Sequence, residues 1–86
     1  MKKTHLQFDA EKLKEEKASG GSFADQSLKR IQGFLAQADG DDRAGKRYLD
    51  RAERVFNLLN KNHSGKKGFE WLDRIKRTDV GKSLDA

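Results

Sequence analysis

The stretch from Arg43 to Asn60 limits what this chain can fold into more than any other part of the sequence. Its apolar side chains recur at the i, i+3, i+4, i+7 spacing of one helical face, whereas Asp50, Arg54 and Asn57 lie on the opposite face. The pattern predicts a surface helix over 43–60 with one buried side. The residues of that buried side are Tyr48, Leu49, Ala52, Val55, Phe56 and Leu59.

A second helix is predicted over residues 23–38. Ser22 with Asp25 three residues later is a capping-box pattern at its start. The acidic turn that follows is expected to hold Gly40 in the left-handed conformation and to cap the next helix with an aspartate. The apolar arc is broad enough to contact two neighbouring helices. Its members are Ala24, Leu28, Ile31, Leu35 and Ala38, widened by Phe23, Ser27 and Phe34.

The third predicted helix covers residues 66–77 and follows a turn over 61–65. Phe69, Leu72 and Ile75 share its inward face, and its charged side chains lie outward. Because both connections are short, the three helices are expected to pack as antiparallel neighbours. The sequence therefore predicts an all-α fold, a small three-helix bundle.

The N-terminal segment is predicted to be a weakly helical or disordered arm. Thr4–Phe8 alternates like a short strand but has no evident partner strand, and Leu13 is the only apolar residue larger than alanine in the helix-forming stretch after it. An arm that orders on a partner is the functional alternative for this segment. The expected organisation is a flexible arm over 1–21, a helical bundle domain over 22–78 and a flexible tail over 79–86.

The charge of the chain is compatible with a polyanionic partner, and a solvated helical surface is the structural alternative. The net charge is +5, from 19 basic and 14 acidic residues, and the excess is largest in the C-terminal third. The chain has no cysteine, which excludes disulfides and thiolate metal sites and fits a reducing cytoplasm. It also has no apolar run typical of a signal peptide or a membrane span. We expect a cytoplasmic protein with no membrane partner.

No catalytic or metal-binding constellation is evident. His5 and His63 are not spaced to meet a serine and an acid on one helical face, and a small bundle leaves little room for a dry pocket. The segment 60–65 has oxygen ligands at positions 1, 3 and 5 of a calcium loop, but position 12 is Trp71 instead of a glutamate. We expect no enzyme, no cofactor, no metal and no small-molecule substrate.

Nucleic-acid binding is the first functional hypothesis. The helix over 43–60 and the helix over 66–77 could form a helix–turn–helix-like pair, although the turn between them is long and no outward amide is placed to read bases. Contact with the phosphate backbone is therefore favoured over sequence-specific reading of DNA, and the function is nucleic-acid-associated or regulatory. The predicted binding residues are Arg43, Arg47, Arg51, Arg54, Lys61, Lys66, Lys67, Arg74 and Arg77.

A protein–protein adaptor or inhibitor is the second functional hypothesis. Leu58 and Trp71 lie off the buried stripes of their helices, and arginines flank Leu58. Tryptophan and arginine are enriched at binding hot spots, so these residues could contact an acidic protein surface. The structural alternative is that Leu58 and Trp71 cover each other across the turn. No motif in the chain identifies a family.

Overall fold

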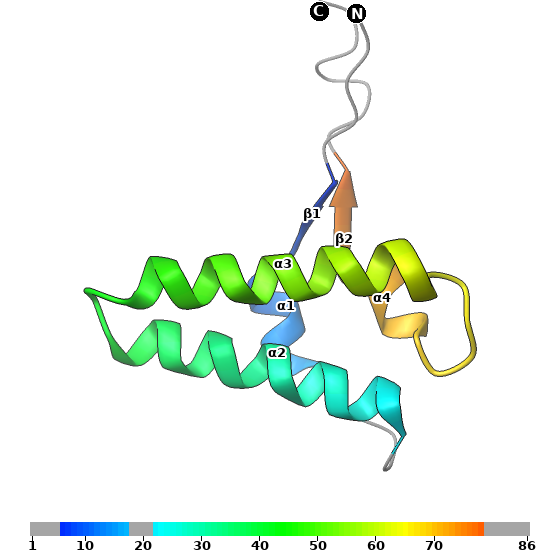
Figure 1. Ribbon diagram of the computed structural model, residues 1–86, viewed down its shortest axis with the longest axis horizontal. Coiled ribbons are helices and arrows are strands. Elements are labelled where there is room, and N and C mark those ends of the chain that lie inside the picture. Colours follow the sequence, from blue (N-terminus) through cyan, green and yellow to red (C-terminus); the bar gives the residue numbers. More distant parts are fainter. Residues whose placement is uncertain (1–5, 18–21, 79–86) are drawn as a thin grey trace, which may run out of the picture.

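A computed structural model of the chain describes residues 6–17 and 22–78. Within these ranges the fold is small and mostly helical, as the sequence predicts (Figure 1). The helices are α1 (Ala10–Glu15), α2 (Phe23–Gly40), α3 (Gly45–His63) and α4 (Glu70–Ile75), and the strands are β1 (Leu6–Phe8) and β2 (Lys76–Thr78). None of the helices in the described ranges is long and apolar enough to cross a membrane.

Helices α2 and α3 form the long antiparallel hairpin on which the molecule is built (Figure 1). The predicted cap of α2 is confirmed, because the Ser22 Oγ accepts a hydrogen bond from the Asp25 N–H at 3.3 Å. Gly40 does not adopt the predicted left-handed conformation but continues the helix. Asp41 holds the turn instead, since its Oδ1 accepts the N–H groups of Arg43 and Ala44 at 2.9 and 3.1 Å.

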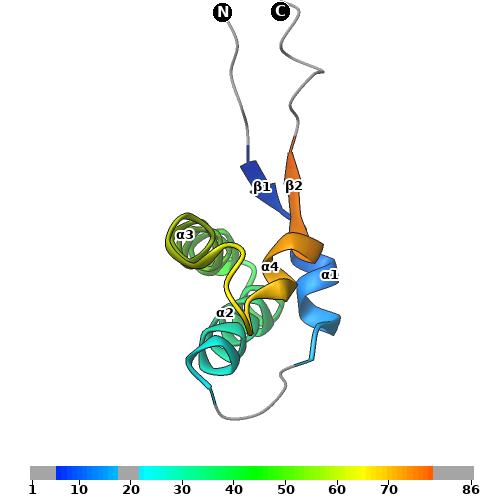
Figure 2. The ribbon, with the colours of Figure 1, turned by 90° about the vertical axis from the view of Figure 1, so that its right-hand side faces the viewer.

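The smaller elements cover one face of this hairpin. Figure 2 shows α1, α4 and the strands on the same side of α2 and α3. The core lies between these elements and the hairpin: Leu13 of α1 is fully buried, and the ring centroids of Phe8 and Phe56 lie 5.1 Å apart. The remaining core residues are Ala24, Leu28, Ile31, Leu35, Ala52, Leu59, Phe69, Trp71, Leu72 and Ile75.

The expectation of a loose N-terminal arm does not hold for residues 6–17. β1 pairs with β2 in an antiparallel register that places Gln7 opposite Arg77, and Asp9 caps α1 by accepting the Lys12 N–H at 3.2 Å. The strand-like alternation therefore has a partner, which lies about 70 residues further along the chain. A single large side chain, Leu13, is enough to hold a short helix when tertiary packing buries it. Residues 1–5, 18–21 and 79–86 lie outside the described ranges, so the predicted domain boundaries and tail remain predictions.

The predicted third helix is also corrected. α3 extends through most of the predicted turn to His63, and the chain then turns through Gly65 and Gly68, whose φ angles of 85° and 93° suit glycine. α4 is only six residues long and runs directly into β2. Its predicted inward residues are buried as expected. The structure thus does not confirm a three-helix bundle: the described residues form four helices and a two-stranded sheet.

Candidate functional site

The two faces of the α2–α3 hairpin differ in what lies on them. On the covered face, Gln32 of α2 donates hydrogen bonds to the carbonyl groups of Leu13 and Glu16, at 3.1 and 2.5 Å. On the other side of α2, half a helical turn away, Arg30 and Phe34 line a groove of about 310 Å³ between α2 and α3. Figure 2 shows no described element over that side. We call this surface the open face; its residues are Arg30, Phe34, Arg47, Arg51, Arg54, Val55 and Leu58.

Guanidinium groups surround an apolar floor in the groove. Phe34 and Val55 are half-buried and pack against the core, so their exposed parts form the floor. The Arg30 guanidinium lies 5.9 Å from the centroid of the Phe34 ring, and the Arg51 guanidinium lies 5.6 Å from the centroid of the Tyr48 ring. These distances are within the range of cation–π contacts. The groove therefore offers both positive charge and an aromatic surface.

The arginines of the open face have no acidic partners among the described residues. Arg47, Arg51 and Arg54 share one stripe of α3 because they follow the i, i+4, i+7 spacing. The ion pairs of the described ranges all lie elsewhere: Lys14–Asp39, Arg74–Glu16 and Lys76–Asp73. Asp50 and Glu53 do not line the groove but lie on the other side of Arg54, which borders both surfaces. The open face therefore has positive charge available to bind an anion.

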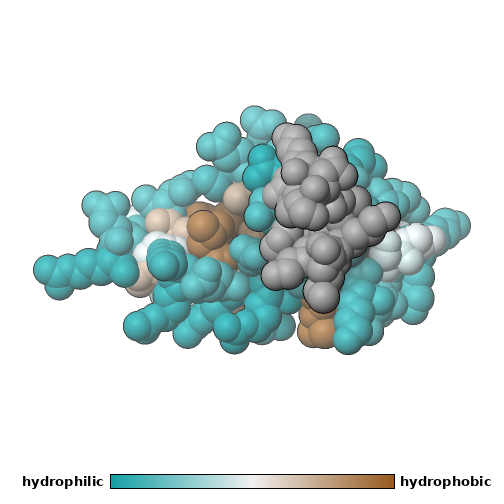
Figure 3. Space-filling model, turned by 90° about the horizontal axis from the view of Figure 1, so that it is seen from above, coloured by the Kyte–Doolittle hydropathy of each residue, from teal (hydrophilic) through white to brown (hydrophobic). Residues whose placement is uncertain are grey.

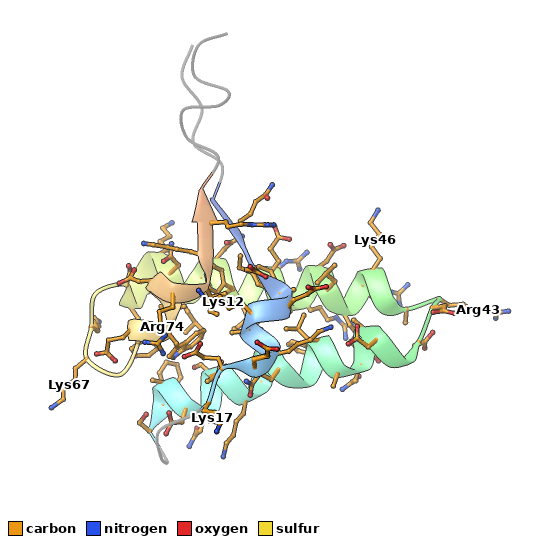
Figure 4. The ribbon with its side chains drawn as sticks, turned by 180° about the vertical axis from the view of Figure 1, so that it is seen from behind. Lys12, Lys17, Arg43, Lys46, Lys67 and Arg74 are labelled. Carbon is orange, nitrogen blue, oxygen red and sulfur yellow. The ribbon has the colours of Figure 1, made fainter. Side chains whose placement is uncertain are left out.

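The structure does not bring the nine predicted nucleic-acid-binding residues into one patch. Arg47, Arg51 and Arg54 lie together, whereas Arg43 and Lys67 extend from opposite ends of the molecule (Figure 4). The other predicted residues are dispersed over the end of α3, the loop after it, and the side of the molecule that carries the sheet. These are Lys61, Lys66, Arg74 and Arg77.

Arg74 has a structural partner. Its guanidinium pairs with the Glu16 carboxylate, with Nε and Oε1 3.1 Å apart, and so links α4 to the end of α1. The hydrogen bond to Glu16 raises the pKa of Arg74 above its ordinary value, so the guanidinium stays charged at neutral pH. This contact occupies Arg74 on the covered face of the hairpin.

Trp71 does not belong to an exposed binding surface. It is only 4 % exposed, and its ring centroid lies 6.4 Å from that of Phe69 in the core. Leu58 remains 60 % exposed, so Trp71 does not cover it. Leu58 is one of three large hydrophobic side chains that are exposed in the described ranges, together with Phe23 and Leu49. The face seen in Figure 3 is mostly hydrophilic, with small hydrophobic patches.

Three residues of the groove were not among the predicted site residues: Arg30, Phe34 and Val55, of which Val55 was predicted only as part of a buried face. Helical spacing places Phe34 at the edge of the core and Arg30 on the outside of the same helix. Only the antiparallel register of α2 and α3 shows that both lie next to Arg51. The sequence signal that could have found them is the arginine four residues before an aromatic residue on one helical face, a spacing at which side chains meet.

His63 lies in an aromatic cluster instead of a polar loop. Its ring stacks on Phe69 with centroids 4.7 Å apart and an interplanar angle of 13°, and the Phe23 ring lies 5.5 Å away. This cluster closes the end of the hairpin near the turn that leads to α4. Within the described residues, no group of three or more histidine, cysteine or acidic side chains is placed to hold a metal ion.

No protein family, no curated protein and no solved structure matches the chain.

Proposed function

We propose that this protein is a non-catalytic, nucleic-acid-associated or regulatory binding protein that contacts the phosphate backbone through its open face. The observation that supports the proposal most is the gathering of Arg30, Arg51 and Arg54 around one groove, without an ion-pair partner in the described ranges. We further propose a cytoplasmic location, which the absence of cysteine favours.

Arginine is well suited to this role. Its planar guanidinium donates paired hydrogen bonds to phosphate oxygens and is less strongly hydrated than the lysine ammonium, so it gives up less hydration on binding. Successive arginines on α3 are about 5–6 Å apart at the level of their Cβ atoms, so several can contact one strand of nucleic acid. Asp50 and Glu53 flank only one edge, and they repel phosphate toward the groove side of the stripe.

The dependence of binding on salt tests the proposal. Each phosphate that the protein neutralises adds roughly −0.9 to the slope of log K against log salt concentration on duplex DNA. Removing Arg51 and Arg54 with the double variant Arg51→Gln/Arg54→Gln should weaken binding of a labelled mixed-sequence duplex and make this slope shallower by about 2. The measurement is fluorescence anisotropy at several salt concentrations.

A matched control removes the same charge elsewhere. Lys12 and Lys46 are exposed and lie away from the groove (Figure 4), so Lys12→Gln/Lys46→Gln should change affinity and slope much less. Equal losses in the two double variants would show that only net charge matters, and the open face would then not be the binding surface. A protein that binds neither the duplex nor a single strand at low salt would refute nucleic-acid binding itself.

The exposure of Leu58 supports a second candidate function, a protein–protein adaptor or inhibitor. Leu58 is 60 % exposed and lies about one helical turn after Arg54 and Val55 on α3. An acidic partner helix with one apolar face would complement this surface. Leu58→Ala should then reduce binding of an acidic amphipathic peptide by at least tenfold and leave duplex binding unchanged. Trp71 does not contribute to this candidate, because it lies in the core.

A further inference from the structure

Two arginines that line the groove, one on each helix, also lie over aromatic rings. Arg30 lies over Phe34 on α2, and Arg51 lies over Tyr48 on α3. Arg51 thus contacts the Tyr48 ring and lines the same groove as Phe34.

Both rings are partly exposed, and an exposed arginine lies over each of them, so a base that stacks on a ring takes the place of the guanidinium. Phe34 and Tyr48 are half-buried, so the core fixes part of each ring and leaves the rest at the surface. Fixed rings lose little conformational freedom when a flat ligand stacks on them. The groove of about 310 Å³ is at the lower end of the range for small-molecule sites, which is room for a flat base but not for a double helix.

Resting on the function proposed above, we infer that the open face binds single-stranded nucleic acid by stacking unpaired bases on Phe34 and Tyr48. Arg30 and Arg51 cover the other faces of the bases or bind the adjacent phosphates. Proteins that bind single strands combine a positively charged groove with aromatic rings in this way. A duplex keeps its bases stacked inside the helix, so it can engage only the arginines.

The residues that line the groove favour this occupant over other anions. No acidic side chain lines the groove, so nothing in it would repel a strand of phosphates. An inorganic phosphate would use the guanidinium groups and leave the rings without a partner. A nucleotide strand satisfies both, because it carries one base and one phosphate in every unit.

The test compares four labelled probes of equal length by fluorescence anisotropy. They are a mixed-sequence single DNA strand, the same strand as RNA, the DNA duplex, and a single strand with abasic sites that keeps the phosphates but lacks bases. The inference predicts that both single strands bind at least tenfold more tightly than the abasic strand, and also more tightly than the duplex. The ratio of RNA to DNA affinity then identifies the natural class of strand.

Variants locate the stacking site. Phe34→Leu and Tyr48→Leu keep an apolar side chain but remove a ring, and each should weaken single-strand binding by about 5- to 100-fold while the duplex affinity changes less than about twofold. A thermal melt shows whether these half-buried substitutions leave the protein folded. Arg51→Lys affects an exposed residue and keeps the charge, so its expected tenfold loss of single-strand affinity reports the planar contact alone. Arg43→Lys, at the far end of the hairpin, is the matched control and should have no effect.

The outcomes distinguish failure of base stacking from failure of nucleic-acid binding as a whole. If all four probes bind equally and with the same salt dependence, the protein contacts phosphates and the stacking inference is overturned while the proposed function stands. Unchanged single-strand affinity in Arg51→Lys together with either folded leucine variant would overturn it as well. If no probe binds at low salt, the proposed function fails and the inference fails with it.

Discussion

The covered and open faces of the α2–α3 hairpin use the same two helices in different ways. On the covered face two polar contacts join the smaller elements to α2: Gln32 donates hydrogen bonds to the end of α1, and Lys14 and Asp39 are paired at 2.5 Å. On the open face Arg51 and Arg54 have no ion-pair partner in the described ranges. Pairing of polar groups, more than apolar content, thus distinguishes the structural face from the candidate binding face.

The lack of ion-pair partners on the open face, within the described ranges, has a consequence for stability. Cations of like sign on one helix face repel one another, so a stripe of unpaired arginines lowers stability slightly and does not contribute to the fold. A role in folding therefore does not account for the arginines of the open face, and the binding of an anion is the role proposed for them above. Substitutions on the two faces should accordingly separate stability from binding.

The largest expected effect is the truncation of Leu13, which is fully buried between α1 and the hairpin. Leu13→Ala should lower the free energy of unfolding by about 2–5 kcal/mol, because it removes apolar contacts and leaves a cavity. The matched control on the open face is Leu58→Ala, which should change stability by less than about 0.5 kcal/mol. Urea unfolding followed by circular dichroism measures both. A well-tolerated Leu13→Ala would mean that residues 6–17 do not pack as described.

The next largest change in stability is expected at the turn of the hairpin, because both faces depend on the geometry of this turn. A Cβ atom on Gly45 would lie 2.8 Å from the backbone oxygen of Ala38, so Gly45→Ala should destabilise the protein by about 1–3 kcal/mol. Gly33 is in the middle of α2 with nothing within 4 Å of its Cβ position. Gly33→Ala should therefore stabilise the protein by about 0.5–1 kcal/mol. Thermal melts of the two variants should move in opposite directions, and a shift in the same direction would contradict the close approach at Gly45.

Loss of the Gln32 side-chain amide, which joins α1 to α2, should have a smaller effect on stability. Gln32→Ala removes the donor for the Leu13 and Glu16 carbonyls and should cost about 0.5–1.5 kcal/mol. Gln37→Ala makes the same change at an exposed position of α2, so helix propensity cancels in the comparison. Amide hydrogen exchange in α1 should accelerate in the first variant alone. Equal exchange in both would show that the amide does not anchor α1.

The smallest effect concerns the exposed ion pair of the covered side. The Arg74 side chain is 54 % exposed, so Arg74→Gln should cost no more than about 1 kcal/mol, and less at high salt. Lys67→Gln removes an unpaired charge from the loop and should be neutral. Chemical denaturation at low and high salt compares the two variants. A loss that does not change with salt would indicate that Arg74 contributes through packing and not through its charge.

The long helices could be predicted from the sequence because their periodicity extends over many turns. The cap at Ser22 and the buried positions Ala52, Phe56 and Leu59 follow the helical pattern directly. Short elements could not be predicted in this way. β1 and β2 are each three residues long and depend on pairing between the two ends of the chain, which local pattern does not encode.

The candidate site could likewise be predicted only in part from the sequence. Arg47, Arg51 and Arg54 could be assigned to one stripe because they share a helix. Arg30 and Phe34 join them only through the register of the hairpin, and Trp71 is removed from the surface by elements that the sequence did not place. Tertiary contact, not helical spacing, decides which exposed residues act together.

A two-dimensional amide NMR titration with a nucleic-acid strand at low and moderate salt tests the central claim most directly. If the open face binds the strand, the amide shifts should change around Arg30 and Phe34 and along Arg47–Leu58. These changes should decrease as salt increases. The amides of α1, α4 and the sheet should stay unchanged. Changes confined to α1, α4 or the sheet, or a spectrum that does not respond at either salt concentration, would contradict the assignment of the open face as the binding surface.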